Sequence, residues 1–364
     1  MSGTVAFAER LTARTAMTHT WAALLSSLLD RRDLTSAETA WAMSQIVSGE
    51  ASPVRVAGFA TALRAKGETA AEVEGLVAAL RASAARVAIP GTTADIAGTG
   101  GDRTGAANIS TVAAIVAAST GVTVVKHGGR AASSTTGGAA DLVEYLGVPL
   151  ELTPAQAARV AAEAGITFLF APMFNSGLRH AATVRRQLGV PTVFNILGPL
   201  INPAAPAHQV IGVADARMAP VIAEMVAAGG RSALVVRGDD GLDKLTTVTT
   251  SRVWTVHDGV MTRTVLDPRE LGLSRPDPAA LRGGDAAANA RIAHAVLDGR
   301  PGPIRDVVLL NAAAVLVAAS PHRPSLVDAL ATAMVRCAEA VDSGAARATL
   351  ARWVAAGRSA YAGA

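Results

Sequence analysis

The amino-acid sequence predicts an α/β protein in which a small N-terminal helical domain precedes a larger α/β domain with a mostly parallel sheet. Residues 20–87 show only the apolar spacing that is typical of helices. From Pro90 onward, short apolar runs bounded by glycine alternate with Ala-rich helical stretches, as in parallel sheets that are covered on both faces. The tail, from about residue 285, is mainly helical again.

The helical domain is expected to contain four helices. Their apolar residues fall within 21–29, 40–47, 54–63 and 73–80. We expect Ser36 to cap the second helix at its N-terminus and Gly49 to end it. Gly67 should end the third helix, and Thr69 followed by Glu72 has the spacing of a capping box for the fourth.

Five apolar runs are expected to form strands of the larger domain: Ala94–Ala97, Val122–Val125, Thr192–Phe194, Val210–Val213 and Ala233–Val236. Each precedes a loop and a helical pattern, so most of them should run parallel. The segment Ala313–Val317 is expected to be the most buried part of the tail. We therefore predict an N-terminal extension (1–19), a helical domain (20–90) with the C-terminal helices packing nearby, and an α/β domain (91–364).

The composition excludes several classes of protein. Half of the 364 residues are apolar and 17% are charged, which argues against intrinsic disorder. The longest apolar stretch, Val307–Ala319, is too short to span a membrane and contains Asn311. Glu9 and Arg10 interrupt the apolar core that a signal peptide needs, so a cytoplasmic location is expected. Cys337 is the only cysteine, which excludes an internal disulfide.

The net charge of +4 and the pI of about 9.8 raise the question of nucleic-acid binding. Only three lysines occur (Lys66, Lys126 and Lys244), and the many arginines are scattered rather than gathered in runs. A nucleic-acid site normally needs basic residues concentrated on one surface. The sequence therefore does not favour a nucleic-acid partner.

A glycine-rich turn joins the first expected strand to the next helix, in the segment ADIAGTGGDRTGAANIST (94–111). Glycines such as Gly98 let main-chain N–H groups approach an anion closely, and the helix N-terminus after Asn108 adds a favourable dipole. The hydroxyls of Ser110 and Thr111 suit a phosphate or Mg²⁺. Such a turn also occurs as a purely structural feature, so this segment alone leaves both interpretations open.

The next strand leads into VVKHGGRAASSTTGG (124–138), which delivers Lys126, His127 and Arg130 and then several hydroxyls. Two cations and serines at a strand end suit a polyanion such as pyrophosphate. A solvated charge cluster is the structural alternative.

A third polar segment, GDDGLDKLTT (238–247), holds three carboxylates: Asp239, Asp240 and Asp243. Magnesium prefers a few such oxygen ligands together with substrate phosphates. An exposed acidic turn would have the same composition.

In this order, the segments resemble those of the anthranilate phosphoribosyltransferases of tryptophan biosynthesis. The resemblance runs from near Trp21 to the C-terminal helices, and its most specific parts are GTGGD, KHG-RAASS and VFNILGPLINPA. It implies a fold shared with the pyrimidine nucleoside phosphorylases and homodimers formed through the helical domain. It also implies Mg²⁺-assisted transfer of the phosphoribosyl group of 5-phosphoribosyl diphosphate (PRPP) to the nitrogen of anthranilate, with release of pyrophosphate.

The resemblance also implies roles for individual residues. PRPP would be bound by Gly98, Thr99, Gly101, Asp102, Asn108, Ser110, Thr111, Lys126 and Ser134. The acceptor, an aromatic carboxylate, would be bound by His127, Gly129, Asn175, Leu178 and Arg185, of which Arg185 matches the arginine that contacts the carboxylate. The metal would be bound by Ser110 and Asp243. We assign no catalytic nucleophile, because displacement through an oxocarbenium-like state depends on positioning and charge stabilisation.

Four features depart from the family pattern. Gly129 replaces an asparagine that helps to position anthranilate, and Ala106 replaces a threonine that usually contacts PRPP. Lys244 replaces the glutamate of a metal-binding Asp-Glu pair. A stretch that typically carries histidine, proline and a bulkier or polar residue is here occupied by Asn175, Ser176 and Leu178. Because these changes cluster around the acceptor and the metal, a paralogue that uses another aromatic acid is an alternative to ordinary tryptophan biosynthesis.

Two further function classes stay open on the sequence alone. One is a non-catalytic or nucleic-acid-binding paralogue of the same fold, and the other is a nucleoside phosphorylase that uses phosphate as its nucleophile. The intact pyrophosphate motifs favour the transferase, and Arg185 favours an acceptor that carries a carboxylate.

Overall fold

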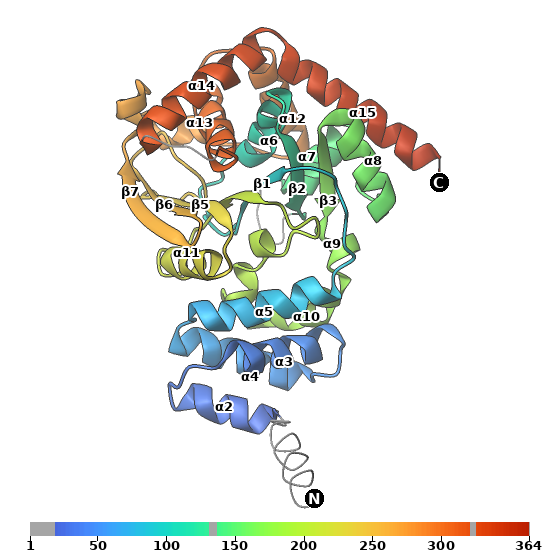
Figure 1. Cartoon of the computed structure of the whole chain (residues 1–364), viewed down its shortest axis with the longest axis vertical. Helices are drawn as coiled ribbons and strands as arrows, with labels where there is room; N and C mark the ends of the chain where they lie inside the picture. Colours follow the sequence, from blue (N-terminus) through green and yellow to red (C-terminus); the bar gives the residue numbers. More distant parts are fainter. Residues whose placement is uncertain (1–18, 131–136, 321–324, 364) are drawn as a thin grey trace, which may run out of the picture.

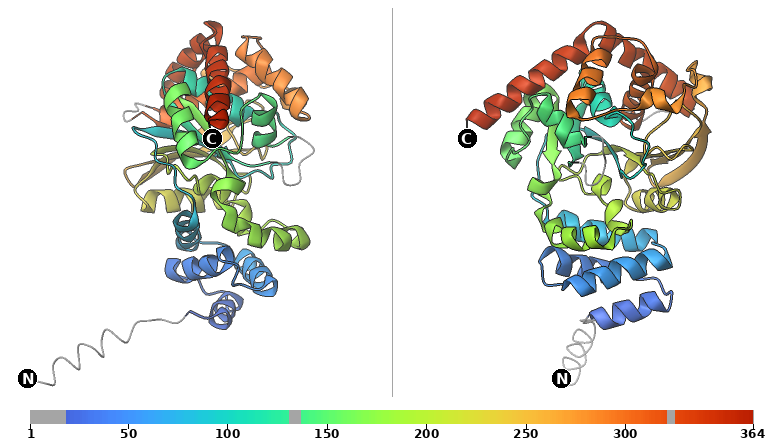
Figure 2. Two further views of the ribbon diagram at one scale, coloured as in Figure 1. Left: turned by 90° about the vertical axis from the view of Figure 1, so that its right-hand side faces the viewer. Right: turned by 180° about the vertical axis from the view of Figure 1, so that it is seen from behind.

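The computed structural model describes residues 19–130, 137–320 and 325–363. A helical unit forms one end of the molecule, the sheet lies in the middle, and the C-terminal helices cover the far side of the sheet (Figure 1). Figure 2 shows the same order of layers from two further sides. The predicted fold class, a small helical unit plus a larger α/β unit, is confirmed.

The helical unit contains the four expected helices: α2 (Trp21–Leu29), α3 (Ser36–Val47), α4 (Pro53–Lys66) and α5 (Ala70–Ser83). The capping box at the start of α5 is present, since Thr69 and Glu72 exchange hydrogen bonds. The expected cap of α3 is wrong by one residue. Thr35, not Ser36, caps this helix, because only Thr35 lies three residues before Glu38 and can complete a capping box with it.

The sheet has seven strands in the order β3-β2-β1-β4-β5-β6-β7. They are β1 (Thr93–Gly98), β2 (Thr123–Gly128), β3 (Ile166–Phe170), β4 (His208–Gly212), β5 (Ser232–Gly238), β6 (Ser251–His257) and β7 (Val260–Leu266). Strands β1 to β5 pair in parallel, and β6 and β7 extend the sheet in antiparallel fashion. A mostly parallel sheet is therefore confirmed, with β3, β6 and β7 added to the strands that the sequence predicts.

One expected strand is wrong. Residues 192–194 lie mainly in a short 3-10 helix, η2 (Val193–Asn195), which begins with a capping box between Thr192 and Asn195. Pro191 precedes it and lacks the N–H that a central strand would donate. Val193 and Phe194 are nevertheless buried, so the apolar run correctly marks a core segment without marking a strand.

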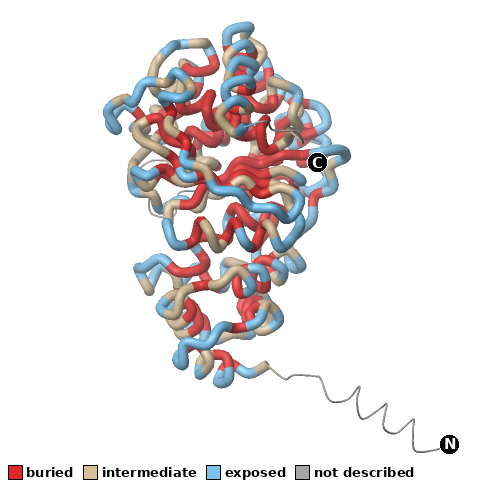
Figure 3. The backbone as a smooth tube through the Cα atoms, turned by 60° about the vertical axis from the view of Figure 1, so that its left-hand side comes forward, coloured by how far each residue is buried: buried red, intermediate tan, exposed pale blue. Residues whose placement is uncertain are grey.

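Alternate residues of the central strands face two separate cores. Val210 and Leu234 belong to the core beneath α6 (Ile109–Ser119), whereas Ile211 and Val235 face α11 (Met218–Ala228). The second core continues into the helical unit, where α10 (Arg179–Leu188) packs on α3 and α4. Figure 3 shows buried segments in both units. Because this core crosses the boundary, the division at residue 90 stays a prediction. Of the predicted extension 1–19, residues 1–18 lie outside the described residues.

The C-terminal helices are α12 (Ala286–Leu297), α13 (Pro303–Ala318), α14 (Leu326–Asp342) and α15 (Ala345–Ala362). They do not pack beside the helical unit as expected. Helix α13 packs on α6 and α14, and α15 packs on α6 and on α8 (Pro154–Ala164), at the opposite end of the molecule (Figure 1). The reason is that α13 is buried on every side from Val307 to Ala318, including the predicted segment Ala313–Val317. Such a helix needs the sheet layer on one side and another helix on the other.

The remaining short elements are α7 (Ala139–Tyr145), α9 (Ala171–Phe174), η1 (Ser176–Leu178), η3 (Gly198–Leu200), η4 (Pro268–Leu271) and η5 (Pro278–Leu281). Cys337 is buried in α14. Within the described ranges, we find no helix with the length and apolar character that a membrane span requires.

Candidate functional site

The segments singled out in the sequence meet at one edge of the sheet. Strands β1, β2, β4 and β5 are parallel, so their carboxyl ends lie at the same edge. The chain leaves β1 toward β2 on one side, and it leaves β4 toward β5 on the other. In open α/β sheets, ligands bind in the crevice at such a topological switch point. The candidate site is therefore the crevice between the ends of β1 and β4.

The glycine-rich loop after β1 is held against the end of β4. The Thr99 N–H donates to the carbonyl oxygen of Gly212 (2.9 Å), and the Thr99 hydroxyl accepts from the Ala214 N–H (3.1 Å). Gly100 and Gly101 have φ of 70° and 77°, in the left-handed region that favours glycine. This conformation lets the chain turn within the crevice instead of leaving it.

The first turn of α6 presents two free hydroxyls. Ser110 and Thr111 are buried, and neither side chain makes a hydrogen bond to any described residue. The side chain of Asn108 does not cap the helix: its amide donates to the Gly137 carbonyl (2.9 Å), and its carbonyl accepts from Asn289 (2.7 Å). Asn108 therefore anchors the surrounding loops and leaves the helix N-terminus free to bind an anion.

Lys126 is buried on β2, and its ammonium donates to the carbonyl oxygen of Ile96 (2.9 Å). Burial lowers the pKa of Lys126, and the nearby Asp95 opposes this shift. Asp95 accepts hydrogen bonds from the Asn202 amide (2.8 Å) and the His127 N–H (3.3 Å), and its burial raises its pKa to about 6. Lys126 is thus held in place by β1 and keeps N–H donors for a ligand.

Arg130, the second cation of this segment, is directed elsewhere. It is exposed and forms ion pairs with Asp141 and Glu144 on α7 (both 2.8 Å). Of the two cations expected at the end of β2, Lys126 is the one that forms no ion pair with a carboxylate of the described residues. Arg130 fits the alternative of a solvated charge cluster.

His127 has both ring nitrogens occupied by the protein. Its Nδ1 lies 3.1 Å from the Gly198 carbonyl oxygen, which accepts only, so Nδ1 carries the proton and donates. Its Nε2 therefore accepts from the Asn175 amide (3.2 Å), which also contacts the Ile201 carbonyl (3.4 Å). Burial lowers the pKa of His127 to about 4. The ring is neutral and has no nitrogen left for a substrate.

Arg185, on α10, is a partly buried guanidinium without a counter-ion. It lies over the Phe194 ring, with 5.9 Å from its Cζ to the ring centre, and burial lowers its pKa. No carboxylate forms an ion pair with it among the residues that the structure describes. A desolvated cation of this kind is stabilised by a bound anion.

Gly129 leaves open space directly after β2. A Cβ placed at Gly129 would approach only the Cβ of Ala171, at 4.0 Å, and the backbone at Gly129 is not in the left-handed region. A Cβ at this position would therefore meet the described residues at no more than ordinary van der Waals contact. Leu178 is partly buried and packs against the core shared with the helical unit. The glycine therefore adds volume at this position.

Asp243 packs against the glycine-rich loop. Its carboxylate lies so close to Gly98 that the glycine has no room for a Cβ, and one of its oxygens accepts the Gly100 N–H (2.7 Å). Its other oxygen contacts the Lys244 ammonium, which also lies 3.4 Å from Asp102. Asp102, Asp243 and Lys244 form one cluster at the edge of the crevice.

The other two carboxylates of the acidic loop do not join this cluster. Asp239 binds the Thr250 hydroxyl (2.6 Å), and Asp240 binds the Thr246 hydroxyl (2.7 Å). No group of three histidine, cysteine or acidic side chains is arranged for a metal ion within the described ranges. Of the three aspartates of this loop, Asp239 and Asp240 therefore stabilise the loop itself, and Asp243 is the one that reaches the cluster.

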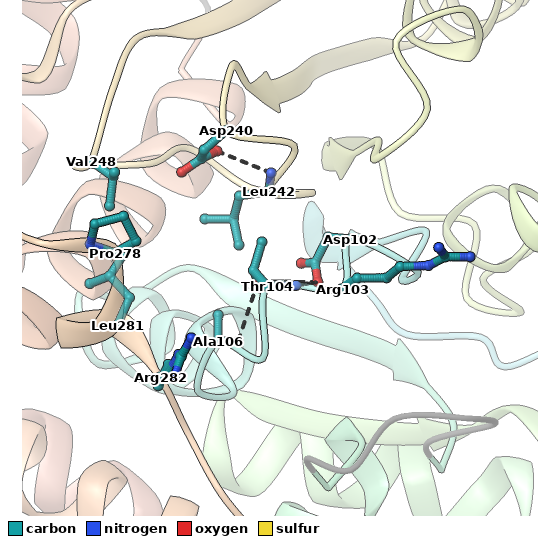
Figure 4. Close-up of a pocket in the computed structure, with 10 residues that line it drawn as sticks. All are labelled: Asp102, Arg103, Thr104, Ala106, Asp240, Leu242, Val248, Pro278, Leu281 and Arg282. Atoms are coloured by element: carbon teal, nitrogen blue, oxygen red, sulfur yellow. Dashed lines mark hydrogen bonds between the residues drawn. The ribbon is translucent and has the colours of Figure 1, made fainter.

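A cavity of about 400 Å³ lies behind the glycine-rich loop (Figure 4). It is lined by Asp102 and Thr104 of this loop, by Leu242 and by η5 residues such as Leu281, whereas the Arg103 side chain extends away from the others. The Ala107 N–H donates to the Leu281 carbonyl (2.9 Å), which ties the loop to η5. The cavity adjoins the cluster through Asp102.

Comparison with known proteins shows to which family the chain belongs. Residues 91–347 match the glycosyl transferase family a/b domain, and residues 22–84 match the helical bundle domain of the same family. The chain is 56% identical over 336 residues to the anthranilate phosphoribosyltransferase of Streptomyces griseus, covering 92% of this chain and 95% of that protein. The corresponding protein of Acidothermus cellulolyticus is 57% identical over 347 residues, with 95% and 98% covered. The chain belongs to the anthranilate phosphoribosyltransferase family.

Solved structures of anthranilate phosphoribosyltransferases have the same fold. The protein from Thermus thermophilus has a TM-score of 0.85 at 40% identity, covering 92% of this chain and 99% of that one. The protein from Saccharomyces cerevisiae in complex with PRPP and Mg has a TM-score of 0.85 at 28% identity, covering 93% and 98%. The resemblance stated from the sequence motifs is confirmed.

Most residues assigned from the family resemblance gather at the crevice. The loop after β1, the start of α6, Lys126 and Asp243 lie at the carboxyl edge, whereas Ser134 lies outside the described residues. The sequence reasoning missed the supports Asp95, Asn202 and Asn289. Asp95, an aspartate within an apolar strand, is the one sequence signal that could have revealed these supporting hydrogen bonds, because a buried carboxyl group needs polar partners.

Proposed function

We propose that this chain transfers the 5-phosphoribosyl group of PRPP to the amino nitrogen of anthranilate or a closely related aromatic carboxylate and releases pyrophosphate. The observation that supports this best is the presence of both kinds of binding group that the two substrates need. Lys126 and the first turn of α6 offer a cradle for phosphates, and Arg185 offers a cation without a counter-ion for a carboxylate. The relatives named above support the same reaction in tryptophan biosynthesis.

PRPP would lie along the glycine-rich loop. Main-chain N–H groups of this loop and of the α6 N-terminus would bind phosphate oxygens, as at other helix N-termini. The free hydroxyls of Ser110 and Thr111 and the ammonium of Lys126 would complete the contacts. Gly98, Thr99, Gly101, Asp102 and Asn108 would shape this cradle.

The acceptor would bind on the other side of the ribose. Arg185 would hold the carboxylate, and His127, Gly129, Asn175 and Leu178 would form the walls. The space at Gly129 supports an acceptor that is larger than anthranilate or differently substituted. Since an amide at this position would position anthranilate, its absence is expected to make anthranilate a poor substrate.

The chemistry is a displacement at the anomeric carbon. A bond forms between the amine nitrogen and C1 of the ribose while the bond from C1 to the pyrophosphate oxygen breaks, and the nitrogen then loses a proton to solvent. His127 cannot accept this proton, because both ring nitrogens are already hydrogen-bonded. The protein acts by orienting the two substrates and stabilising the leaving phosphates.

Magnesium carried by PRPP would neutralise charge on the departing pyrophosphate. The residues at the crevice fit one such ion, because the Ser110 hydroxyl is free and lies in the first turn of α6.

Replacing Lys126 with methionine is expected to weaken PRPP binding about 10- to 150-fold, or about 1.5–3 kcal/mol, since a charged hydrogen bond is lost while the side-chain volume is kept. Calorimetry with Mg–PRPP measures this. Retained folding is checked by circular dichroism, since Asp95 loses a neighbour. Unchanged PRPP affinity in a folded variant would remove Lys126 from the site.

Introducing the missing amide should restore anthranilate use. Gly129→Asn is expected to raise kcat/KM for anthranilate about 3- to 10-fold, the range for one neutral hydrogen bond. Gly129→Ala, which fills part of the space without an amide, is the matched control and should not raise it. Equal anthranilate turnover in all three proteins would contradict the proposed role of this position.

The experiment that tests the whole proposal is a pyrophosphate-release assay with PRPP and a panel of aromatic amino acids and carboxylates. Release with at least one of them supports the transferase. Release of base from nucleosides and phosphate would instead support the phosphorylase, and DNA retention without turnover the binding paralogue.

We also propose a homodimer formed through the helical unit, and a cytoplasmic location. Leu29 on α2 and Val54 on α4 are 76% and 81% exposed, which supports an interface there. Light scattering of the purified chain tests this, and a monomer at micromolar concentration would contradict it.

A further inference from the structure

The cluster at the edge of the crevice contains a cation of the protein itself. The Lys244 ammonium contacts Asp243 and lies 3.4 Å from Asp102, so it bridges two carboxylates that come from different loops. Asp243 is buried, and its second oxygen is bound by the Gly100 N–H (2.7 Å). Only 15% of the Lys244 side chain is exposed. The ammonium is therefore held in place on two sides.

These residues do not fit a protein-bound divalent cation. An ion between Asp102 and Asp243 would lie beside the ammonium, and in a partly buried site the repulsion between the two cations is only weakly screened. No third carboxylate of the described loops is close enough to compensate, because Asp240 binds the Thr246 hydroxyl and the Leu242 N–H. The charge that a metal would supply is already supplied by lysine.

The position of the ammonium also suits an anion. Lys244 has three N–H donors, of which two are directed at Asp243 and Asp102. The glycine-rich loop, whose N–H groups we assign to phosphate, contacts the same aspartate through Gly100. The remaining N–H donor is thus next to the proposed place of the PRPP phosphates.

We propose that Lys244 replaces a protein-bound divalent cation between Asp102 and Asp243 and donates its remaining N–H to a phosphate oxygen of PRPP. The second half of this statement rests on the proposed function. In the free protein, the cluster of Asp102, Asp243 and Lys244 then binds no divalent ion. A single Mg²⁺ enters the site together with PRPP.

The first test uses the free protein and Mn²⁺, whose bound fraction is counted by electron paramagnetic resonance. We expect no Mn²⁺ at the cluster of Asp102, Asp243 and Lys244 in the unmodified chain. Lys244→Glu should bind one Mn²⁺ at least about tenfold more tightly, since the local charge falls by two units. Lys244→Glu combined with Asp243→Asn should lose this ion. If Lys244→Glu does not fold, Lys244→Gln is expected to show a smaller gain.

The proposal would be overturned if the unmodified free protein bound Mn²⁺ tightly and Asp243→Asn abolished this binding. Equal Mn²⁺ binding in all variants would overturn it as well. With PRPP present, we expect one Mn²⁺ per chain in the unmodified protein and two in Lys244→Glu, and two in both would also overturn it. Failure of PRPP to bind at all would contradict the proposed function instead, and the free-protein measurement would still decide whether lysine replaces the metal.

Discussion

Replacing Arg185 with methionine is expected to lower kcat/KM for an aromatic carboxylate acceptor about 30- to 1000-fold, with little change in PRPP affinity. The guanidinium is partly buried over the Phe194 ring, and among the described residues no carboxylate neutralises it. Loss of one partner of a buried, hydrogen-bonded charge pair costs about 2–4 kcal/mol. Methionine keeps an unbranched apolar side chain beside Phe194 and removes the guanidinium with its charge and N–H donors.

The neighbouring Arg186 provides a matched control. It is on the same helix and is exposed, so Arg186→Met should leave kcat/KM within about twofold. Steady-state kinetics with the best acceptor of the panel measures both variants. If the two substitutions had equal effects, Arg185 would not be the carboxylate ligand.

Local chemistry explains which parts of the site the sequence could predict. The loop after β1 requires glycine for its left-handed backbone and for close packing against Asp243. Because only glycine meets both requirements, the residue type alone predicts the shape of this loop. The hydroxyls of Ser110 and Thr111 follow from their place in the first turn of a helix. Spacing along the chain was sufficient for these predictions.

Contacts between distant segments were not predictable in this way. Asp95 supports the site through two neighbours. The pairing of β1 with β2 brings Lys126 close to it, and a loop more than 100 residues away in the sequence brings Asn202. Lys244 could be recognised as a departure from the family pattern, but its bridge to Asp102 depends on how two loops meet. The same reason explains the misplaced C-terminal helices, since periodicity shows that α13 is buried without showing against which layer.

The neutral state of His127 leads to a pH-dependent stability. Burial lowers its pKa from 6.5 in the unfolded chain to about 4 in the fold. A group with a lowered pKa binds fewer protons in the folded state, so its stabilising contribution is fully present above about pH 6.5 and is lost as the pH falls toward 4. Asp95 acts in the opposite direction, because its raised pKa, about 6, makes ionisation costly as the pH rises. The unmodified protein therefore shows only the net of the two effects.

The His127 contribution is isolated by comparison with His127→Gln, which does not titrate and keeps an amide that can donate to Gly198. Between about pH 7.5 and about pH 4.5, the unmodified chain should lose about 2–3 kcal/mol of unfolding free energy relative to this variant. Urea denaturation at the two pH values measures the difference, and Asp95 cancels because both proteins contain it. A His127→Gln variant with the same pH dependence as the unmodified chain would mean that folding does not lower the pKa of His127, and a ring that is protonated at pH 4.5 could not accept the hydrogen bond from Asn175.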